Sequence, residues 1–437
     1  MTYDETVDRL YAALPVFHRT GKAAYKADLD NSLKLDEYFN RPHEKYKCVH
    51  IAGTNGKGSV SHMIAAVLQT AGLKTGLFTS PHLTDFRERI RINGKKIPKQ
   101  TVVDFVEKHC EIILETKPSF FEITSAMAFD HFARNNVDIA VIETGMGGRL
   151  DSTNIIAPIL SVITNIGKDH TEFLGTTIEE IAGEKAGIIK NGIPVVIGEY
   201  EAESARVFAE KASKTNSPSV FADKCLKIKN IKNEQTRTTF EIEYANEVIG
   251  KKDFSVTIDL IGDYQRKNIL TVLASIDLLR QSTPEISDES IKTGLANVVE
   301  LTGLRGRWQI LRTSPLIVCD VGHNAHGLAC TIEQLKKTNR KNLYMIFGVS
   351  ADKDLDSVLP LLPQDAYWYF TQADIPRAMD ASVLAKRCTD FGLTGEIATP
   401  VSHAFEKAEK AADKDDVIFI GGSVFTVADL LACLHEP

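Results

Sequence analysis

The stretch Cys48-Val49-His50-Ile51-Ala52-Gly53-Thr54-Asn55-Gly56-Lys57-Gly58-Ser59 decides the fold of this chain. An apolar run over 48–52, which predicts a strand, leads into three glycines around one lysine, and a serine follows. Apolar residues with helical spacing come next, at Val60, Met63, Ile64, Val67 and Leu68. Backbone N–H groups, the helix dipole and a lysine side chain all favour an anion at such a strand-to-helix turn. The stretch therefore predicts a phosphate-binding loop for a nucleoside triphosphate.

The spacing inside this loop differs from the common Walker form, G-x-x-x-x-G-K-[ST]. Only two residues separate Gly53 from Gly56, Gly58 stands where a Mg²⁺-binding hydroxyl usually lies, and Ser59 carries the hydroxyl one place later. The alternative is an ordinary glycine-rich turn between a strand and a helix. The predicted strand before the loop and the predicted helix after it favour the phosphate-binding interpretation.

The composition is that of a globular protein with more than one core. A chain of 437 residues is too long for a single core and predicts two domains. The net charge of −7 argues against general nucleic-acid binding, and no long uninterrupted apolar stretch suggests a membrane span. The seven cysteines are scattered and form no C-x-x-C pair, which favours reduced thiols. We therefore expect a cytoplasmic protein without a nucleic-acid or membrane partner.

The order of apolar runs predicts an α/β fold. In residues 1–300, strand-like runs alternate with helical patterns and predict a mostly parallel sheet of the P-loop type; they lie at 48–52, 76–79, 137–143, 159–165 and 194–198. Period-two alternation predicts a small antiparallel β subdomain at about 218–262. After helical patterns at 264–300 and a glycine-containing connector at 301–307, four more strand-like runs predict a second, smaller Rossmann-like α/β domain over 301–437, with strands at 316–320, 343–347, 366–371 and 416–420.

Two polar residues that follow predicted strands could bind a metal ion. Ser80 comes after the strand at 76–79, where its hydroxyl could bind a metal or, as its spacing favours, cap a turn. Glu143 ends the strand at 137–143, in the same domain as the phosphate loop, which is where Mg²⁺ is usually held. A carboxylate directly after a buried apolar run is costly unless it is paired or metal-bound. We therefore favour a metal-binding role for Glu143.

A histidine and a lysine farther along the chain each have two interpretations. His170 follows the strand at 159–165 and could be a ligand or an ordinary structural histidine. Lys185 lies on the apolar stripe of a helix that Thr177 and Glu180 begin with a capping box, together with Ile178, Ile181, Ala182 and Ile189. An inward-facing lysine could form a buried ion pair. Its desolvated amine could instead react with CO₂ to form a carbamate, which replaces a cation with oxygen ligands for a metal.

Taken together, these segments resemble the folylpolyglutamate and dihydrofolate synthases, a branch of the Mur ligase superfamily whose members use ATP to join an amine to a carboxylate. The matching strings are G-T-N-G-K-G-S, S-P-H-L, E-T-G-M-G-G-R-L-D, D-H and E-K-A-G, in that order. The resemblance continues through Asn268, Gly306-Arg307 and Asp320-Val321-Gly322-His323-Asn324, and it covers about residues 48 to 325.

The resemblance implies a set of roles. The implied Mg²⁺ ligands are Ser80, Glu143 and His170, and Lys185 is similar to the family's carbamylated lysine. The implied ATP-binding residues are Asn55, Gly56, Lys57, Gly58 and Ser59 in the loop, with Asn268, Arg307 and Asp320 across the domain cleft. The implied pterin site contains Ser119, Phe120, Phe121, Glu122, Leu150, Asp151 and Ser152. The Phe120-Phe121 pair could stack on the pterin, although such a pair is more often part of a core.

The activity that this resemblance implies is the formation of an amide from a carboxylate. We expect ATP to phosphorylate the carboxylate of a reduced folate or of dihydropteroate, and the amine of L-glutamate to displace phosphate from the acyl phosphate. Lys57 and two Mg²⁺ ions would neutralise charge, and Lys185 and His323 complete the expected catalytic set. The second domain would supply Asp320 and His323, and its closure would exclude water. A monomer is expected.

Two alternative functions remain at this point. One is another Mur-type ligase that acts on a peptidoglycan precursor, against which the S-P-H-L segment and the Glu-Lys-Ala-Gly spacing argue. The other is a nucleotide-dependent switch protein, which usually carries a guanine-reading N-K-x-D segment, and the sequence contains none.

Overall fold

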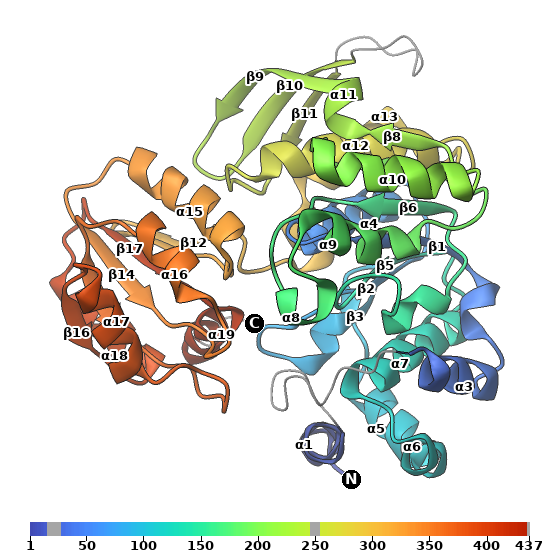
Figure 1. Ribbon diagram of the computed structural model, residues 1–437, viewed down its shortest axis with the longest axis horizontal. Helices are drawn as coiled ribbons and strands as arrows, with labels where there is room; N and C mark the ends of the chain where they lie inside the picture. Colours follow the sequence, from blue (N-terminus) through green and yellow to red (C-terminus); the bar gives the residue numbers. More distant parts are fainter. Residues whose placement is uncertain (15–27, 245–253, 435–437) are drawn as a thin grey trace. The chain divides into compact units, whose positions relative to one another are not determined.

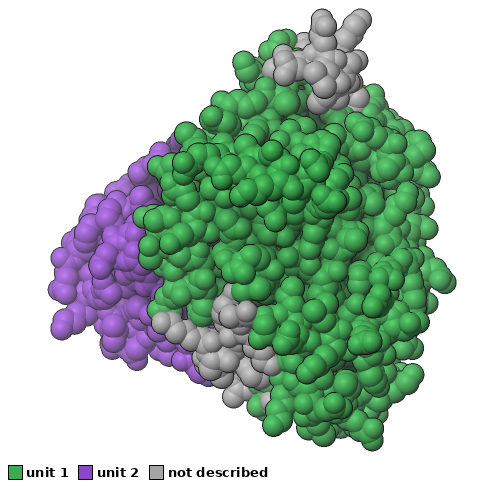
Figure 2. Space-filling model, turned by 45° about the vertical axis from the view of Figure 1, so that its right-hand side comes forward, with its two compact units in different colours: residues 1–82, 86–260, 265–304 green, residues 83–85, 261–264, 305–437 purple. Residues whose placement is uncertain are grey.

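The computed structural model describes residues 1–14, 28–244 and 254–434, and these form two compact units. Unit 1 contains Met1–His82, Phe86–Leu260 and Gln265–Leu304, and unit 2 contains Leu83–Asp85, Ile261–Tyr264 and Arg305–Pro437. Figure 2 shows the two units in green and purple. The main division between the units falls between Leu304 and Arg305. The sequence predicted a boundary between residues 300 and 301, four residues earlier.

Unit 1 is built on an eight-stranded, mostly parallel sheet (Figure 1). Its order is β4 (Lys95–Lys96), β3 (Ile90–Ile92), β2 (Thr75–Phe78), β5 (Ile139–Glu143), β1 (Lys47–Ala52), β6 (Leu160–Ile163), β7 (Val195–Ile197) and β8 (Ser219–Phe221). Six neighbouring strands pair in parallel, in the order β2, β5, β1, β6, β7 and β8. At one edge, β3 and β4 pair in antiparallel fashion. The α/β prediction is confirmed, including the five strands predicted in this region.

The two faces of this sheet carry separate apolar layers because strand residues alternate in direction. Val49, Ile51 and Val141 face one layer, which contains α4 (Lys57–Thr70), α12 (Gln265–Leu279), α13 (Asp288–Ala296) and α14 (Val298–Thr302). Ala140 and Ile142 face the opposite layer, which contains α3 (Asp30–Tyr38), α5 (Lys99–Lys108), α6 (Cys110–Thr116) and α7 (Phe120–Arg134). Beyond β6, that face is covered by α8 (Thr171–Leu174), α9 (Ile178–Lys185) and α10 (Ala202–Lys214).

The predicted β subdomain is smaller than expected. A three-stranded antiparallel sheet contains β9 (Leu226–Asn233), β10 (Thr238–Tyr244) and β11 (Phe254–Ile258). The prediction placed residues 218–225 in this subdomain as well, and that part is wrong: β8 pairs with β7 in the main sheet, and α11 (Ala222–Cys225) follows it. Because the inward-facing residues of β10 and β11 join the layer around α4 and α12, the small sheet extends the core of unit 1.

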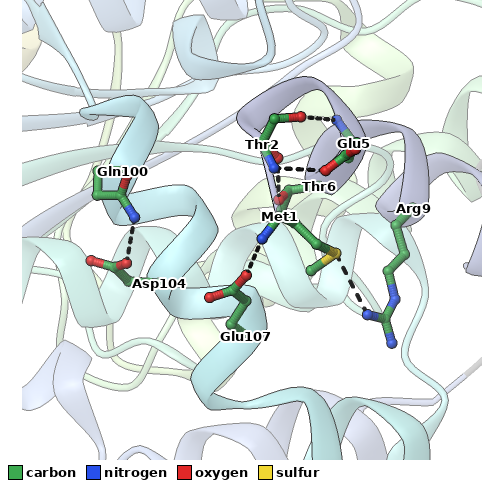
Figure 3. Close-up of polar contacts among 8 residues, drawn as sticks. All are labelled: Met1, Thr2, Glu5, Thr6, Arg9, Gln100, Asp104 and Glu107. Atoms are coloured by element: carbon green, nitrogen blue, oxygen red, sulfur yellow. Dashed lines mark hydrogen bonds and ion pairs between the residues drawn. The ribbon is translucent and has the colours of Figure 1, made fainter.

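The first helix, α1 (Tyr3–Ala13), is tied to α5 at its start. Thr2 and Glu5 form a capping box, and the amino group of Met1 lies 2.5 Å from Glu107 Oε1 in α5. Figure 3 shows these contacts, together with the hydrogen bond from Gln100 to Asp104 within α5. The capping box satisfies backbone N–H groups that would otherwise have no partner at the start of the helix.

Unit 2 is a smaller α/β unit with a six-stranded sheet. Its order is β12 (Gln309–Thr313), β13 (Leu316–Cys319), β17 (Val417–Gly421), β14 (Leu343–Phe347), β15 (Tyr367–Phe370) and β16 (Gly395–Ile397), and only β12 is antiparallel. One face packs on α15 (Ala325–Lys337), α16 (Leu355–Val358) and α17 (Ala381–Asp390), and the other on α18 (Val401–Ala411) and α19 (Val424–Cys433). All four strands predicted here are present, whereas β12 and β16 were not predicted.

Within residues 1–14, 28–244 and 254–434, no helix is both long enough and apolar enough to cross a membrane.

Shortening the side chain of Leu68 in the central helix α4 tests how much the packing of this core contributes to stability. Leu68 of α4 is 0% exposed, whereas Leu114 of α6 is 64% exposed. We expect Leu68→Ala to lower the free energy of unfolding by about 2–5 kcal/mol, because it removes buried methyl groups and leaves a cavity. Leu114→Ala is the matched control, for which we expect a change within about 0.5 kcal/mol. Urea unfolding followed by circular dichroism measures both, and similar losses for the two variants would contradict this packing.

Candidate functional site

The sheet order of unit 1 places four predicted site segments at one edge. Strands β2, β5, β1 and β6 are neighbours and run parallel, so their carboxyl ends meet at the same edge. Ser80 comes after β2, Glu143 ends β5, the phosphate loop follows β1, and the segment after β6 leads to His170. Ligands of open α/β sheets usually bind at such an edge.

The phosphate loop is fixed by the segment that follows β6. Backbone N–H groups of Thr54 and Asn55 donate to the carbonyl and the side-chain oxygen of Asn165, at 3.0 and 2.9 Å. The hydroxyl of Thr164 donates to the Asn55 carbonyl at 2.6 Å. Gly53 adopts φ +148°, and a Cβ there would lie 1.9 Å from Thr164 Oγ1. Glycine is therefore required at this close approach.

Lys57 begins α4 and lies over the loop that precedes it. Its Nζ donates to the carbonyl oxygens of Gly53 and Thr54, at 3.1 and 3.3 Å. This places a cation at the N-terminus of a helix, where the helix dipole also favours an anion. The geometry suits a triphosphate whose charge Lys57 neutralises.

The helix α12 forms hydrogen bonds with the start of α4. Asn268 Nδ2 donates to Gln265 Oε1 at 2.7 Å, and Gln265 Nε2 donates to the buried Ser59 hydroxyl at 3.2 Å. A Cβ on Gly56, which has φ +84°, would lie 2.4 Å from Asn268 Oδ1. The predicted residues Gly56, Ser59 and Asn268 are thus brought together, and the neighbouring Gly58 is buried in the first turn of α4. Gln265, which the sequence did not predict, links them.

The predicted metal ligands Ser80 and Glu143 are in contact. The backbone N–H of Ser80 donates to Glu143 Oε2 at 3.2 Å, and Glu143 is only 3% exposed. Oxygen donors of this kind suit Mg²⁺, which usually keeps several waters and binds substrate phosphates in addition to one or two carboxylates. In the part of the chain that the structure describes, no three His, Cys, Asp or Glu side chains form a metal-binding group. The carboxylate of Glu143 thus fits one ligand position of a Mg²⁺ ion, and the metal-binding roles of Ser80 and Glu143 stay predictions.

His170 lies at the same edge in a left-handed conformation. Its φ is +51°, it immediately precedes α8, and its backbone N–H donates to Asp169 Oδ1 at 3.0 Å. Positive φ is uncommon for a residue with a side chain and occurs preferentially at functional sites. The position is compatible with the predicted metal-binding role, which stays a prediction.

Lys185 is buried and donates a hydrogen bond to the phosphate loop. It is 3% exposed at the end of α9, and its Nζ donates to the Gly53 carbonyl at 2.9 Å. Burial, and then the nearby charge of Lys57, lower the pKa of Lys185 from 10.5 to about 7. Thr177 and Glu180 form the predicted capping box. The inclusion of Ile189 on the same helical face was wrong, because α9 ends at Lys185 and a 3₁₀ turn over Ala186–Ile188 follows.

Part of the predicted pterin segment caps a helix and packs in the core. Ser119 is the N-cap of α7 and forms a capping box with Glu122. The ring of Phe120 stacks on Tyr11, with centroids 4.8 Å apart, and the guanidinium of Arg89 lies 5.2 Å from its centroid. Phe121 packs against Phe78 at 5.7 Å between centroids. Both rings therefore contact other side chains of the protein, and their contact with a pterin stays a prediction.

The remaining predicted pterin residues lie in the loop after β5. Asp151 is buried, and its carboxylate accepts hydrogen bonds from the N–H groups of Met146 and Thr153 at 2.9 and 3.0 Å. Burial raises the pKa of Asp151, while these hydrogen bonds oppose the rise. Leu150 precedes it, and Ser152 begins a 3₁₀ helix over Ser152–Ile155. Ser152 and Glu122 also line a small pocket, together with Ser32, Asp36, Phe39 and Phe129.

In unit 2, the predicted residues gather at the carboxyl end of β13. The Asp320 carboxylate is buried and accepts hydrogen bonds from Tyr264 Oη and Trp308 N, both at 2.7 Å. Arg307 Nη1 donates to the Gly306 carbonyl at 3.4 Å, and His323 Nδ1 lies 3.1 Å from the Val321 carbonyl. Tyr264 and Trp308 were not predicted, and no local spacing in the sequence marks them as neighbours of Asp320.

Comparisons with known proteins cover nearly the whole chain. Residues 51–276 match the Mur ligase middle domain, and residues 306–424 match the Mur ligase, glutamate ligase domain. The dihydrofolate synthase/folylpolyglutamate synthase of Bacillus subtilis is 34% identical over 429 residues, which cover 94% of this chain and 96% of that protein. A probable bifunctional folylpolyglutamate synthase/dihydropteroate synthase of Haloferax volcanii is 32% identical; 92% of this chain matches, and it spans 48% of that longer protein.

A solved structure shows the same fold with a nucleotide and a metal ion. The bifunctional folylpolyglutamate synthase/dihydrofolate synthase of Yersinia pestis, complexed with AMPPNP and a Mn ion, matches with a TM-score of 0.83 and 26% identity. The match covers 100% of this chain and 98% of that one.

The lowered pKa of Lys185 predicts a pH-dependent stability. Between pH values of about 7 and 10.5, the folded protein has released this proton while the unfolded chain still holds it, so stability rises with pH across this window. We expect Lys185→Met to remove that contribution, so that the variant gains most relative to the parent near pH 7 and the gain shrinks toward pH 10. Urea unfolding in CO₂-free buffers at several pH values measures the difference. A difference that does not change with pH would contradict the buried, titrating amine.

Proposed function

Because this chain belongs to the folylpolyglutamate and dihydrofolate synthase family of Mur ligases, we propose that it joins L-glutamate to a folate-type carboxylate while ATP is converted to ADP and phosphate. Family membership makes it an ATP-dependent ligase that uses a divalent metal ion. The substrates proposed are dihydropteroate, tetrahydrofolate and its glutamates, and L-glutamate. The match of residues 306–424 to a glutamate ligase domain supports glutamate as the amine.

The observation that carries this proposal is the convergence of two lysines on the phosphate loop beside a buried carboxylate. Lys57 and Lys185 both donate to the Gly53 carbonyl, at 3.1 and 2.9 Å. Glu143 and Ser80 lie at the same sheet edge. Transfer of a phosphoryl group to an anionic carboxylate brings two anions together and needs positive charge, which Lys57 and a divalent metal ion would supply. A kinase-like loop alone needs no second buried lysine, whereas Lys185 lies where its carbamate could ligate that metal.

The proposed reaction has two steps. A carboxylate is a poor electrophile, so its oxygen first takes the γ-phosphoryl group of ATP and forms an acyl phosphate. The amine of glutamate then attacks the acyl carbon, an amide bond forms, and phosphate leaves. Lys57 holds the phosphoryl group during the first step, and a bound Mg²⁺ supplies additional charge neutralisation. Asn55, Gly58 and Asn268 are the further nucleotide-binding residues proposed in unit 1.

The residues of unit 2 keep their proposed roles in the same reaction. Arg307 and Asp320 are proposed to bind ATP, and His323 is proposed to act in catalysis. The four side-chain and backbone groups around Asp320 fix its carboxylate, since Tyr264, Trp308, Gly322 and Thr331 all donate to it. The monomeric state and the cytoplasmic location both stay predictions.

An assay for ADP release tests the reaction. With ATP, Mg²⁺ and L-glutamate present, we expect dihydropteroate, tetrahydrofolate or both to stimulate ADP release and to gain one glutamate, which mass spectrometry detects. We expect Lys57→Ala to lower kcat by ~10²–10³-fold, because it removes a charge that stabilises the transferring phosphoryl group. Lys214→Ala, at an exposed site in the last turn of α10, is the control and should keep normal activity.

Each outcome of this assay has a clear meaning. Stimulation by neither pteridine rules out the proposed activity. Stimulation by a peptidoglycan precursor instead would show a different Mur-type ligase. Slow nucleotide turnover that no acid accelerates would favour a switch protein.

The carbamate on Lys185 is a separate proposal with its own measurement. A lysine with a pKa near 7 is neutral often enough at physiological pH to react with CO₂. The carbamate would exchange a buried cation for an anion that can ligate the metal, which relieves the repulsion from Lys57. We expect protein equilibrated with ¹³C-bicarbonate to show a carbamate carbon resonance that Lys185→Met lacks. The same resonance in both proteins, or in neither, would contradict the proposal.

A further inference from the structure

Arg89 is a buried arginine at the edge of the sheet that carries the phosphate loop. It is 3% exposed and ends the 3₁₀ helix over Phe86–Arg89, directly before β3. Its carbonyl accepts a hydrogen bond from Thr79 N at 3.0 Å, which places it beside Ser80. Ser80 in turn contacts Glu143. Arg89 therefore lies next to the proposed site of phosphoryl transfer.

The guanidinium of Arg89 uses one of its five donors within the described chain. Its Nε donates to His82 Nδ1 at 2.7 Å. Among residues 1–14, 28–244 and 254–434, the two terminal nitrogens make no other hydrogen bond and no ion pair within 4.0 Å. The charges of Glu143 and Glu88 favour the cationic form of Arg89, but neither carboxylate forms an ion pair with it within 4.0 Å. A buried cation without a direct anionic partner is costly, and a bound ligand can supply that partner.

His82 and Tyr11 fix the direction of this guanidinium. Because Arg89 Nε–H donates to Nδ1 of His82, that nitrogen must carry the lone pair and the ring proton must be on Nε2. His82 Nε2 lies 2.9 Å from Tyr11 Oη, so the tyrosine oxygen accepts this proton. The Tyr11 ring stacks on Phe120 with an interplanar angle of 14°, and Arg89 lies over the same Phe120 ring. Both ends of the chain Tyr11–His82–Arg89 are thus held against Phe120.

The neighbouring arginine in β3 gives a useful contrast. Arg91 is also buried, at 5% exposed, but its Nη1 donates to the Gly94 carbonyl at 3.1 Å and its guanidinium packs beside Gly303. Its role is therefore to join two parts of the fold. Arg89 has the same residue type and similar burial, yet its terminal nitrogens have no such acceptor in the described chain.

We propose that Arg89 binds a carboxylate of the substrates through its terminal nitrogens, and that Tyr11 and His82 are positioning residues for it. The inference rests on the proposed ligase function and deepens it. Guanidinium binds carboxylates with two parallel hydrogen bonds, which lysine cannot reproduce. Both substrates carry carboxylates that suit this contact: the pteridine substrate, and L-glutamate with its α- and γ-carboxylates.

Steady-state kinetics of Arg89→Lys test the proposal and separate the two sources. We expect the KM of either the pteridine substrate or L-glutamate to rise at least about tenfold, since a charge-assisted pair is replaced by a point charge. The KM of ATP should change less than about twofold. Whichever KM rises identifies the bound carboxylate. Arg91→Lys is the matched control and should leave all three KM values unchanged, even if it lowers the melting temperature.

Tyr11→Phe tests the positioning residues without disturbing the core. It keeps the ring on Phe120 but removes the oxygen that accepts the His82 proton. We expect a smaller rise in the same KM and an unchanged melting temperature. A purely structural role would give the reverse, with lower thermal stability and unchanged KM values. No effect of Tyr11→Phe on that KM would overturn the positioning part of the proposal.

Direct binding keeps the test decisive if Arg89→Lys folds poorly. The unsubstituted protein is titrated calorimetrically with the pteridine substrate, with L-glutamate, and with analogues of each in which a carboxamide replaces one carboxylate at a time. At least tenfold weaker binding of one analogue supports the proposal. Equal affinities for both acid and amide pairs overturn it, as do unchanged KM values in Arg89→Lys or a rise confined to ATP. An unsubstituted protein that neither pteridine stimulates would instead show that the proposed function itself is wrong.

Discussion

The carbonyl oxygen of Gly53 accepts hydrogen bonds from two lysines, and the rest of the site depends on this arrangement. Lys57 reaches it from the first turn of α4 and Lys185 from the last turn of α9, at 3.1 and 2.9 Å. Two ammonium groups on one carbonyl repel each other, and this repulsion adds to burial in lowering the pKa of Lys185 to about 7. The fold must therefore hold α4 and α9 firmly against the end of β1. It does so with two apolar layers on opposite faces of the sheet, one around α4 and the other around α9 and α10. An anion in the loop would relieve the repulsion, so the site is less favourable empty than filled.

Much of this arrangement was predictable because it is local in the sequence. The apolar run before Gly53, the glycines of the loop and the helical spacing after Lys57 are short-range signals, and the structure confirms the strand and the helix. The same holds for the Thr177–Glu180 capping box and for the burial of Lys185. Errors occurred where two patterns overlap. Residues 219–221 are apolar enough for either sheet and join the main one. Ile189 has helical spacing, but the helix ends before it at Lys185.

Contacts between distant segments could not be predicted. Thr164 and Asn165 bind the phosphate loop across more than a hundred residues of sequence, and Gln265 reaches Ser59 from α12. None has a spacing that sets it apart from an ordinary polar residue. The contacts of Phe120 also come from segments distant in the sequence. The family resemblance implies that this ring lies near a pterin, which stays a prediction, and the sequence gives no sign that Tyr11 and Arg89 pack on it. Such contacts follow from the tertiary fold, which brings α1, the 3₁₀ helix Phe86–Arg89 and α7 together.

The buried charged groups of this protein fall into two kinds, and the difference indicates where its chemistry lies. Asp320 and Asp151 are buried but receive several hydrogen bonds from their own surroundings. Such carboxylates are already compensated, and their first effect is to fix the loops that carry them. Lys185 and Arg89 are equally buried, yet Lys185 has a backbone carbonyl as its acceptor and Arg89 a neutral histidine. Neither acceptor carries a negative charge. Asp169 and Asp151 favour the charged form of Lys185, and Glu143 and Glu88 favour that of Arg89, but no direct ion pair forms with either residue in the described chain. Because burial of a cation without a direct anionic partner destabilises a fold, the presence of both at one sheet edge is explained most simply by anions that arrive with the substrates. The stability of unit 1 and its chemistry then make opposite demands on the same residues, and the apolar layers around the sheet are what allow both to be met.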